Sequence, residues 1–293
     1  MASSDVIGAV KDLGDRVNGH PEHVATVVPQ LIALLDDQRE PLVIAAIVDA
    51  LNKASDEVAS LEALRFVDHS DDSVRLAVAH ALPAGVESPL GTSLAAAGLM
   101  QLTRDPVDEI RDWSTFGLGS QLNVDTTEVR EALWARIDDA SQMIRDEAAV
   151  GLAQRRDRRA VQLVADRLTD EDAGPLVFEA AEYLADPRLH DALRRWSAAR
   201  PDDEAIRRAM HACDGDFQRT RTTRQAELLE AIGRLLTDRV ELTALAMFCD
   251  LQGTDVVMQV DESGRVWNVD SLLARAGHDI ERAAQLGLSD LAR

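Results

Sequence analysis

The stretch DDSVRLAVAHAL, residues 71–82, has an acidic start, a Val-Arg pair and then small or apolar residues at regular spacing. With Val74 as an anchor, positions +4, +7 and +8 hold Val78, Ala81 and Leu82. These offsets fall on one face of an α-helix. Small side chains on that face allow a neighbouring helix to approach closely. The stretch therefore predicts a short, closely packed helix.

The same spacing recurs along the chain. Five apolar anchors are each followed by small or apolar residues at +4, +7 and +8: Val43, Val74, Ile110, Ile144 and Val177. Successive anchors are separated by 31, 36, 34 and 33 residues. A nearly constant period of this length is typical of a repeat array.

A second apolar helix fits before each anchored helix. The five expected segments are residues 23–35, 56–67, 93–102, 127–137 and 157–168. One helix pair cannot bury its apolar stripe alone, but stacked pairs share a continuous core. The sequence therefore predicts an all-α solenoid of about five helix pairs, followed by closing helices, over residues 1–218.

The anchored segments resemble the second helices of HEAT repeats, in the short form found in PBS-lyase-type proteins. The resemblance rests on DDSVRLAVAHAL, DEIRDWSTFGL and SQMIRDEAAVGLA and covers about residues 20–200. It implies a superhelix in which Arg75, Arg111 and Arg145 pair with acidic groups of neighbouring repeats. Ile44 and Phe178 replace this arginine in the first and last units. The resemblance implies a fold and does not by itself imply lyase activity.

Residues 219–293 lose the helical period and suggest a small α+β module. We expect a long helix or helix pair over 219–253, a β-hairpin over 255–269, and short helices over 270–276 and 278–291. A two-residue turn at Ser263-Gly264 would place Val260 opposite Trp267. The module would cap the solenoid or, alternatively, form a homodimer.

Composition restricts the partners that the protein can have. The 293 residues carry a formal net charge of −21, with 46% hydrophobic and 3% aromatic residues. Such a surface repels nucleic acid and anionic membranes and suits a basic partner. No apolar stretch reaches transmembrane length. Because Cys213 and Cys249 form no paired motif, we expect a reducing, cytoplasmic location.

The anchored helices should line the concave side of the solenoid, where aromatic and acidic residues gather. The candidate partner-binding residues are Asp49, His80, Asp112, Trp113, Phe116, Asp146, Glu147, Glu179 and Tyr183. Carboxylates would pair with cations, and aromatic rings would add apolar and cation–π contact. Alternatively, Trp113 and Phe116 fill the inter-repeat gaps left by Ser114 and Gly117.

One cluster of arginines departs from the acidic trend. Arg155, Arg156, Arg158 and Arg159 lie at an inter-repeat turn and could bind a phosphate or an acidic peptide. The alternative is a solvated cluster that pairs with nearby aspartates.

The sequence contains no recognisable catalytic motif. None of the seven histidines is followed by Glu, so HExxH and the His-Glu pairs of HEAT-repeat hydroxylases are not matched. Walker, GxGxxG and GxSxG patterns are also missing from the sequence. We therefore expect no metal ion, no cofactor and no enzymatic activity, but a scaffold that binds a basic protein segment. The alternatives are a lyase-like accessory enzyme and an anion or nucleic-acid binder that uses the arginine cluster.

Overall fold

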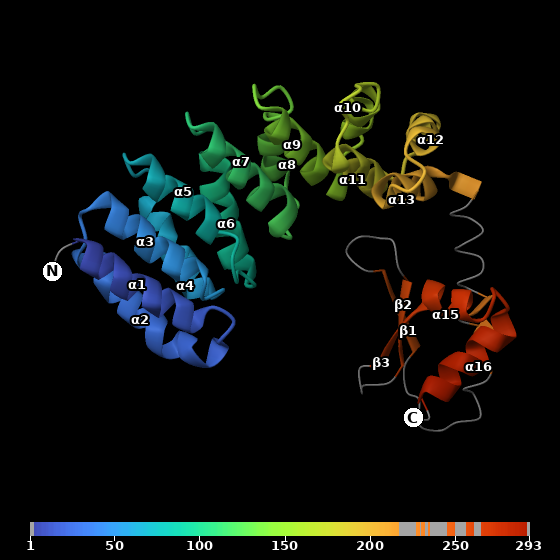
Figure 1. The fold of residues 1–293 in the computed structure, drawn as a ribbon, viewed down its shortest axis with the longest axis horizontal. Coiled ribbons are helices and arrows are strands. Elements are labelled where there is room, and N and C mark those ends of the chain that lie inside the picture. Colours follow the sequence, from blue (N-terminus) through green and yellow to red (C-terminus); the bar gives the residue numbers. More distant parts are fainter. Residues whose placement is uncertain are drawn as a thin grey trace. The chain divides into compact units, whose positions relative to one another are not determined.

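The computed structural model describes residues 3–216, 227–228, 230–231, 234, 245–249, 256–260 and 265–291. It divides into two compact units, residues 1–163 and 164–293, which are treated separately below (Figure 1).

The first unit is built from consecutive helix pairs. Its helices are α1 (Ser3–Val17), α2 (Pro21–Asp37), α3 (Pro41–Asn52), α4 (Glu57–Glu62) with the 3₁₀ turn η1 (Ala63–Phe66), α5 (Asp72–Ala81), α6 (Pro89–Leu102), α7 (Asp108–Phe116) with the π-helical turn η2 (Gly117–Gln121), α8 (Thr127–Trp134) and α9 (Gln142–Gln154). The predicted pairs are confirmed here. Helix α1 was not predicted and adds one more helix at the N-terminal end, where it packs on α2 and α3.

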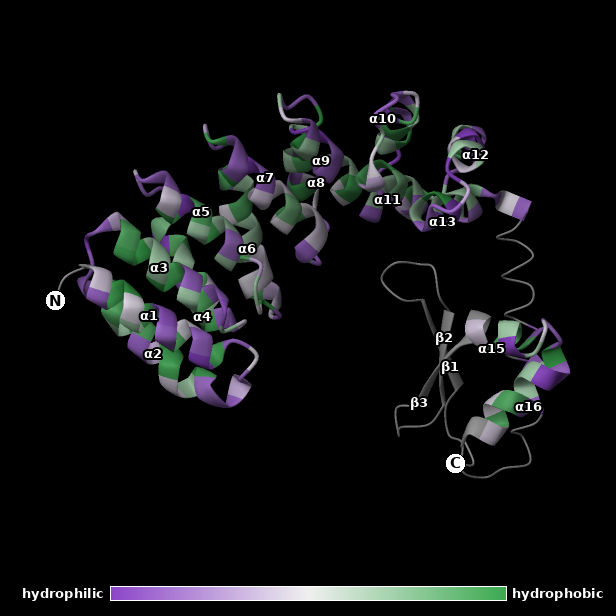
Figure 2. Cartoon of the chain, viewed as in Figure 1, coloured by the Kyte–Doolittle hydropathy of each residue, from purple (hydrophilic) through white to green (hydrophobic). Residues whose placement is uncertain are grey.

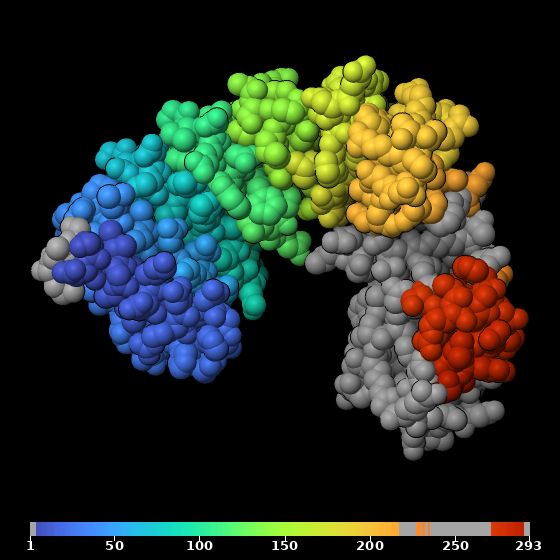
Figure 3. Space-filling view, viewed as in Figure 1, coloured from blue at the N-terminus to red at the C-terminus, as the bar shows by residue number. Residues whose placement is uncertain are grey.

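The helices of the first unit form two adjacent rows. Helices α1, α3, α5, α7 and α9 pack successively against one another, and α4, α6 and α8 form a second row against them. The four anchors in this unit, Val43, Val74, Ile110 and Ile144, are at most 1% exposed. Hydrophobic residues gather where the rows meet (Figure 2), and the space-filling view shows consecutive pairs joined in one continuous surface (Figure 3). The repeat period therefore marks the shared core.

Arginine–aspartate pairs link consecutive repeats at their turns. Arg75 on α5 holds the carboxylate of Asp105 through two bonds, Nε–Oδ2 at 2.6 Å and Nη2–Oδ1 at 3.1 Å. Arg111 on α7 holds Asp139 in the same way, at 2.9 and 3.0 Å. Each aspartate also accepts a backbone N–H two residues further along the chain. The pairing implied by the HEAT resemblance is confirmed at these two turns.

Arg145 departs from this pattern. Its Nη1 donates to the backbone oxygens of Asp139 and Ala140, and its Nη2 donates to Gln142. No carboxylate in the described part of the chain pairs with it, so the implied ion pair is wrong at this position. The backbone contacts match those of Arg75 and Arg111, and they keep the turn in the same conformation.

The second unit contains further helices. They are α11 (Pro175–Leu184), the 3₁₀ turn η3 (Pro187–Leu189), α12 (His190–Ala199) and α13 (Glu204–Cys213), while α10 (Ala160–Arg167) spans the boundary between the units. The fifth anchor, Val177, is buried on α11. The side chain of Asp186 accepts the backbone N–H of Arg188 and caps η3, as its position before Pro187 predicts.

Strands and helices are both present among the described C-terminal residues. Strands β1 (Leu245–Cys249), β2 (Val256–Val260) and β3 (Arg265–Asn268) pair antiparallel in the order β1-β2-β3. Helices α15 (Val269–Arg275) and α16 (Ile280–Leu291) share a core with Leu228 and Ala231. The expected helix over 219–253 is wrong at β1, because a five-residue apolar run does not distinguish a strand from a buried helix.

The pairing of β2 with β3 also differs from the expectation. Val260 pairs with Arg265 and Met258 with Trp267, two positions away from the predicted pairing of Val260 with Trp267. Four residues, not two, therefore separate the strands. The expected turn at Ser263-Gly264 and the expected domain boundary at 218/219 both lie outside the described residues.

Candidate functional site

The anchored helices of the first unit carry a group of acidic and aromatic side chains. Asp49 lies on α3, His80 on α5, and Glu109, Asp112 and Trp113 on α7. Glu109 and Trp113 are four residues apart and therefore lie on one side of α7. The anchored helix is the second, or B, helix of each pair, so we call the surface formed by these five residues the B-helix face.

Three aromatic rings meet on this face. The imidazole of His80 and the indole of Trp113 make an edge-to-face contact, with centroids 4.5 Å apart. Trp113 makes a second edge-to-face contact with Phe116 at 5.9 Å. Phe116 is half-buried, whereas Trp113 remains 41% exposed. Phe116 thus fills part of the space between repeats, while one side of Trp113 remains open to a ligand.

The carboxylates of the B-helix face form no ion pair within the described part of the chain. The side chains of Asp49, Glu109 and Asp112 make no hydrogen bond or ion pair within the described part of the chain, and Asp112 Oδ1 is buried. Desolvation raises the pKa of Asp49 despite the opposing influence of His80 and Lys53. A nearby bound cation would stabilise the charged form of each carboxylate.

Asp112 and His80 show the same shortage of partners. Desolvation raises the pKa of Asp112, and repulsion from Asp108, Asp139 and Glu109 raises it further. Desolvation lowers the pKa of His80, against the attraction of Asp49 and Glu109, which favours the neutral imidazole. Its Nε2 atom is buried and makes no hydrogen bond.

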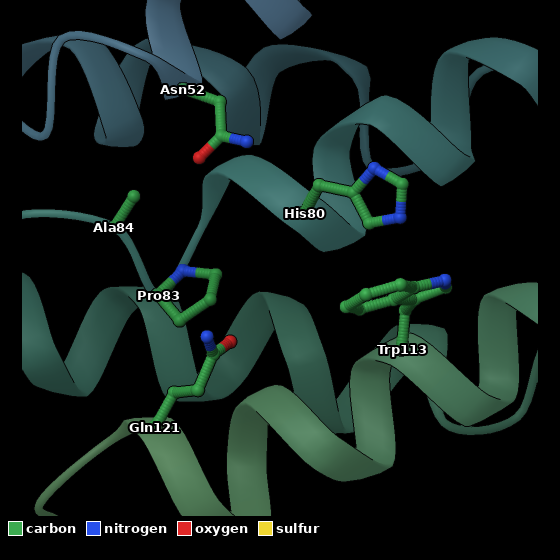
Figure 4. Close-up of a pocket in the computed structure, with 6 residues that line it drawn as sticks. All are labelled: Asn52, His80, Pro83, Ala84, Trp113 and Gln121. Carbon is green, nitrogen blue, oxygen red and sulfur yellow. The ribbon is translucent and has the colours of Figure 1, made fainter. Parts of the chain in front are cut away.

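A pocket of about 270 Å³ opens beside His80 and Trp113. Its lining residues are Asn52, His80, Pro83, Ala84, Trp113 and Gln121. Figure 4 shows His80 and Trp113 on one side, with Pro83, Ala84 and Gln121 on the other. Asn52 is the last residue of α3, Pro83 and Ala84 follow α5, and Gln121 is the last residue of η2. The pocket therefore lies where three repeats end their anchored helices.

A π-helical turn determines the position of Gln121. The backbone N–H of Leu122 donates to Gly117 O at 3.0 Å, which makes this turn one residue wider than an α-helical turn. Gly119 lies against Gly151 of α9, and a Cβ on Gly151 would be 2.7 Å from Gly119 Cα. The turn therefore depends on two glycines that allow this close approach.

The remaining predicted partner-binding residues lie elsewhere. Asp146 is buried and accepts a hydrogen bond from Gln142 Nε2 at 2.7 Å, so it is not on an open surface. Glu147 is half-buried on α9. Glu179 and Tyr183 are half-buried on α11 in the second unit. The first unit thus brings together Asp49, His80, Asp112, Trp113 and Phe116.

Arg155 has a structural position within the predicted arginine cluster. The residue is 9% exposed, and its guanidinium donates only to backbone carbonyls, those of Leu118, Gly119, Leu122, Val124 and Gly151. These oxygens belong to η2, the loop that follows it, and α9. Arg155 therefore stabilises the π-helical turn and has no free donor directed at solvent.

The other three arginines do not form one anion site with Arg155. Arg159 pairs with Asp157 and Glu131, and its guanidinium lies 4.6 Å from the ring of Trp134. Arg156 and Arg158 are exposed, and Arg156 has a left-handed backbone with φ of 51°. Two of the four cations are thus engaged within the chain.

Sequence reasoning did not find several residues of the site. Asn52, Pro83, Ala84 and Gln121 lie at helix ends, outside the periodic positions, and Glu109 belongs to no repeated offset. Only the acidic character of α7 could have suggested Glu109. Within the described ranges, no three His, Cys, Asp or Glu side chains are placed to hold a metal ion, and no helix is long and apolar enough to cross a membrane.

Comparison with known proteins agrees with the helical-repeat fold of the first unit. Residues 96–185 match the family model for HEAT repeats. This part of the chain carries HEAT repeats. In these HEAT repeats, α7 supplies most of the B-helix face.

Protein YibA from Escherichia coli, in strains K12 and O157:H7, is 28% identical to this chain over 112 residues. The match covers 38% of this chain and 40% of YibA, well under two thirds of that protein. The X-ray structure of E. coli YibA is similar with a TM-score of 0.53 and 21% identity, over 65% of this chain and 69% of YibA. At this identity the similarity supports the helical-repeat fold alone.

Human deoxyhypusine hydroxylase, in a structure with glycerol, aligns over 74% of this chain and 81% of its own. The TM-score is 0.34 and the identity is 18%. This similarity is too weak to support a conclusion about activity.

Proposed function

We propose that this protein is a non-catalytic binding protein, and that its B-helix face captures a basic segment of a partner protein. One observation carries the proposal: within the described residues Asp49, Glu109 and Asp112 form no ion pair, and they share the B-helix face with the exposed Trp113. In contrast, the aspartates at the turns are neutralised by arginine. Partly desolvated carboxylates beside an exposed indole match the chemistry of a lysine- or arginine-rich peptide.

The same arrangement determines how the interaction should respond to salt. Asp49 and Glu109 can form ion pairs at the rim, where salt screens them, while the indole of Trp113 gives an apolar contact that salt does not weaken. Binding should therefore weaken with ionic strength but retain a component that depends on Trp113.

A fluorescence-anisotropy titration tests the proposal. The probe is a fluorescein-labelled peptide of alternating arginine and lysine. The neutralised variant carries D49N, E109Q and D112N, and the control variant carries D37N, E87Q and D138N at exposed positions away from the B-helix face. Both variants change the net charge by +3, so a difference between them reports location and not total charge.

We expect the neutralised variant to bind the peptide about tenfold more weakly than the wild type, since three charge contacts of modest strength are removed. The control variant should bind within twofold of the wild type. Equal affinities for the two variants would show that the peptide recognises only the overall charge of −21, and the proposal would fail.

Two further parts of the proposal concern the rest of the molecule. Residues 219–293 form a small α+β module with a β-hairpin, which caps the helical repeats or joins two copies of the chain. The protein acts in the cytoplasm, in keeping with Cys213, which is a buried free thiol.

No described residue specifically favours a lyase-like accessory enzyme, and the internal contacts of Arg155 and Arg159 disfavour an anion or nucleic-acid site at their turn.

A further inference from the structure

We infer that the pocket beside Trp113 is the anchoring site for one arginine side chain of the bound segment. The inference rests on the proposed function and adds the identity of the residue that the face selects. Asn52, Gln121, His80 and Trp113 carry it, because they line an open pocket of about 270 Å³, and two of them belong to the B-helix face.

The indole of Trp113 lacks a cation that comparable indoles in this chain possess. The guanidinium of Arg159 lies 4.6 Å from the ring of Trp134, and that of Arg200 lies 4.3 Å from the ring of Trp196. Trp113 is the one tryptophan, among those with described side chains, that no arginine or lysine covers. A guanidinium from a partner would complete the same stacking arrangement.

The polar groups of the pocket match several N–H donors in one plane. Asn52 and Gln121 each carry an amide oxygen that accepts hydrogen bonds. A guanidinium presents five donors in a rigid fork, whereas an ammonium presents three from one point. The amide acceptors of the pocket therefore favour arginine over lysine.

The backbone adds negative potential at the same place. Asn52 ends α3 and Gln121 ends η2, while Pro83 and Ala84 follow the end of α5. The C-terminal ends of helices carry a partial negative charge. Lys53, the residue that follows α3, is engaged by Asp15, with Nζ–Oδ1 at 2.7 Å. The pocket is therefore a cation site that the chain does not fill by itself.

The test compares two labelled peptides, nona-arginine and nona-lysine, in the same anisotropy titration. Wild-type protein should bind nona-arginine about tenfold more tightly than nona-lysine, since one stacked and multiply bonded guanidinium is gained. Equal affinities for the two peptides would overturn the inference while leaving the proposed function intact. If neither peptide bound, both the inference and the proposed function would fail.

Two variants locate the preference. N52L with Q121M removes the amide acceptors without changing the net charge, and A84F fills the pocket from its wall. We expect each to reduce the arginine preference to within about twofold while the affinity for nona-lysine is retained, because the surrounding carboxylates remain. The ratio between the peptides is unaffected by a general loss of folded protein. A ratio that remains tenfold in both variants would place the arginine site elsewhere.

Discussion

Acidic side chains occupy two kinds of place in the first unit, and their surroundings are opposite. At the turns, Asp105 and Asp139 are 5% and 4% exposed, and each holds an arginine of the preceding repeat. On the B-helix face, Asp49, Glu109 and Asp112 have no such partner among the residues that the structure describes. The turn aspartates therefore connect repeats, whereas the face carboxylates are left to interact with a ligand.

This difference shows how the net charge of an acidic protein should be interpreted when its binding surface is sought. A net charge of −21 says little about binding as long as the pairing of each carboxylate is unknown. Carboxylates that are buried and paired contribute to the fold. Carboxylates that remain unpaired near an exposed aromatic ring cost stability and are better explained by binding. The following substitutions test the two classes in order of expected effect.

The largest effect is expected at the most buried arginine of a turn. R155M would leave five backbone carbonyls without their donor and should lower the free energy of unfolding by about 3–5 kcal/mol. Urea denaturation followed by circular dichroism measures the change. R158M is the control, since Arg158 is exposed at the same turn. If R155M unfolded at the same urea concentration as the wild type, water would be able to replace the guanidinium without loss of stability.

A smaller, pH-dependent effect is expected at the Arg111–Asp139 pair. The hydrogen bond from Arg111 holds the pKa of Asp139 below its ordinary value, against the desolvation that raises it. The stability from this lowered pKa is therefore present above about pH 4 and lost as the pH falls through the pKa of the folded state. R111M should cost about 2–3 kcal/mol at pH 7 and clearly less at pH 3.

Urea denaturation of wild type and R111M at the two pH values provides the measurement. R65M serves as a control because Arg65 is exposed and its pairs with Asp36 and Glu62 are exposed or half-exposed. A cost for R111M that is the same at both pH values would contradict the assignment of the effect to Asp139.

The smallest effect, of opposite sign, is expected on the B-helix face. D112N removes a carboxylate whose pKa is raised by desolvation and by three neighbouring carboxylates. Its charged form destabilises the folded chain above the ordinary pKa, so D112N should increase stability at pH 7 by about 0.5 kcal/mol or less. Thermal unfolding at pH 7 measures this gain. A loss comparable to that of R111M would show that Asp112 belongs with the turn aspartates.

The sequence predicts the repeats well because each anchor repeats the same packing requirement. The five helix pairs and the arginine–aspartate pairs at Arg75 and Arg111 follow from residues at fixed offsets. Arg145 shows the limit of this approach, because a repeated residue can keep its backbone contacts and lose its ion pair. The strand β1 was missed because its apolar run is too short to show a period.

The candidate site was only partly predictable. His80, Asp112, Trp113 and Phe116 follow from positions on the anchored helices, and the structure brings them together. The lining of the pocket by Asn52, Ala84 and Gln121 depends on where helices end, which periodicity does not determine. Arg155 was predicted as a ligand for an anion, but its side chain is buried. The charge of a residue in the sequence does not show whether that residue is buried.

The π-helical turn Gly117–Gln121 has a consequence for how such a site can arise. One additional residue within a helix rotates everything after it by roughly 100°. The additional residue of this turn therefore determines whether the side chain of Gln121 reaches the pocket wall. Gly119 and Gly151 leave room for the wider turn, because their backbones approach closely. New specificity can thus enter a repeat array through helix length as well as through substitution.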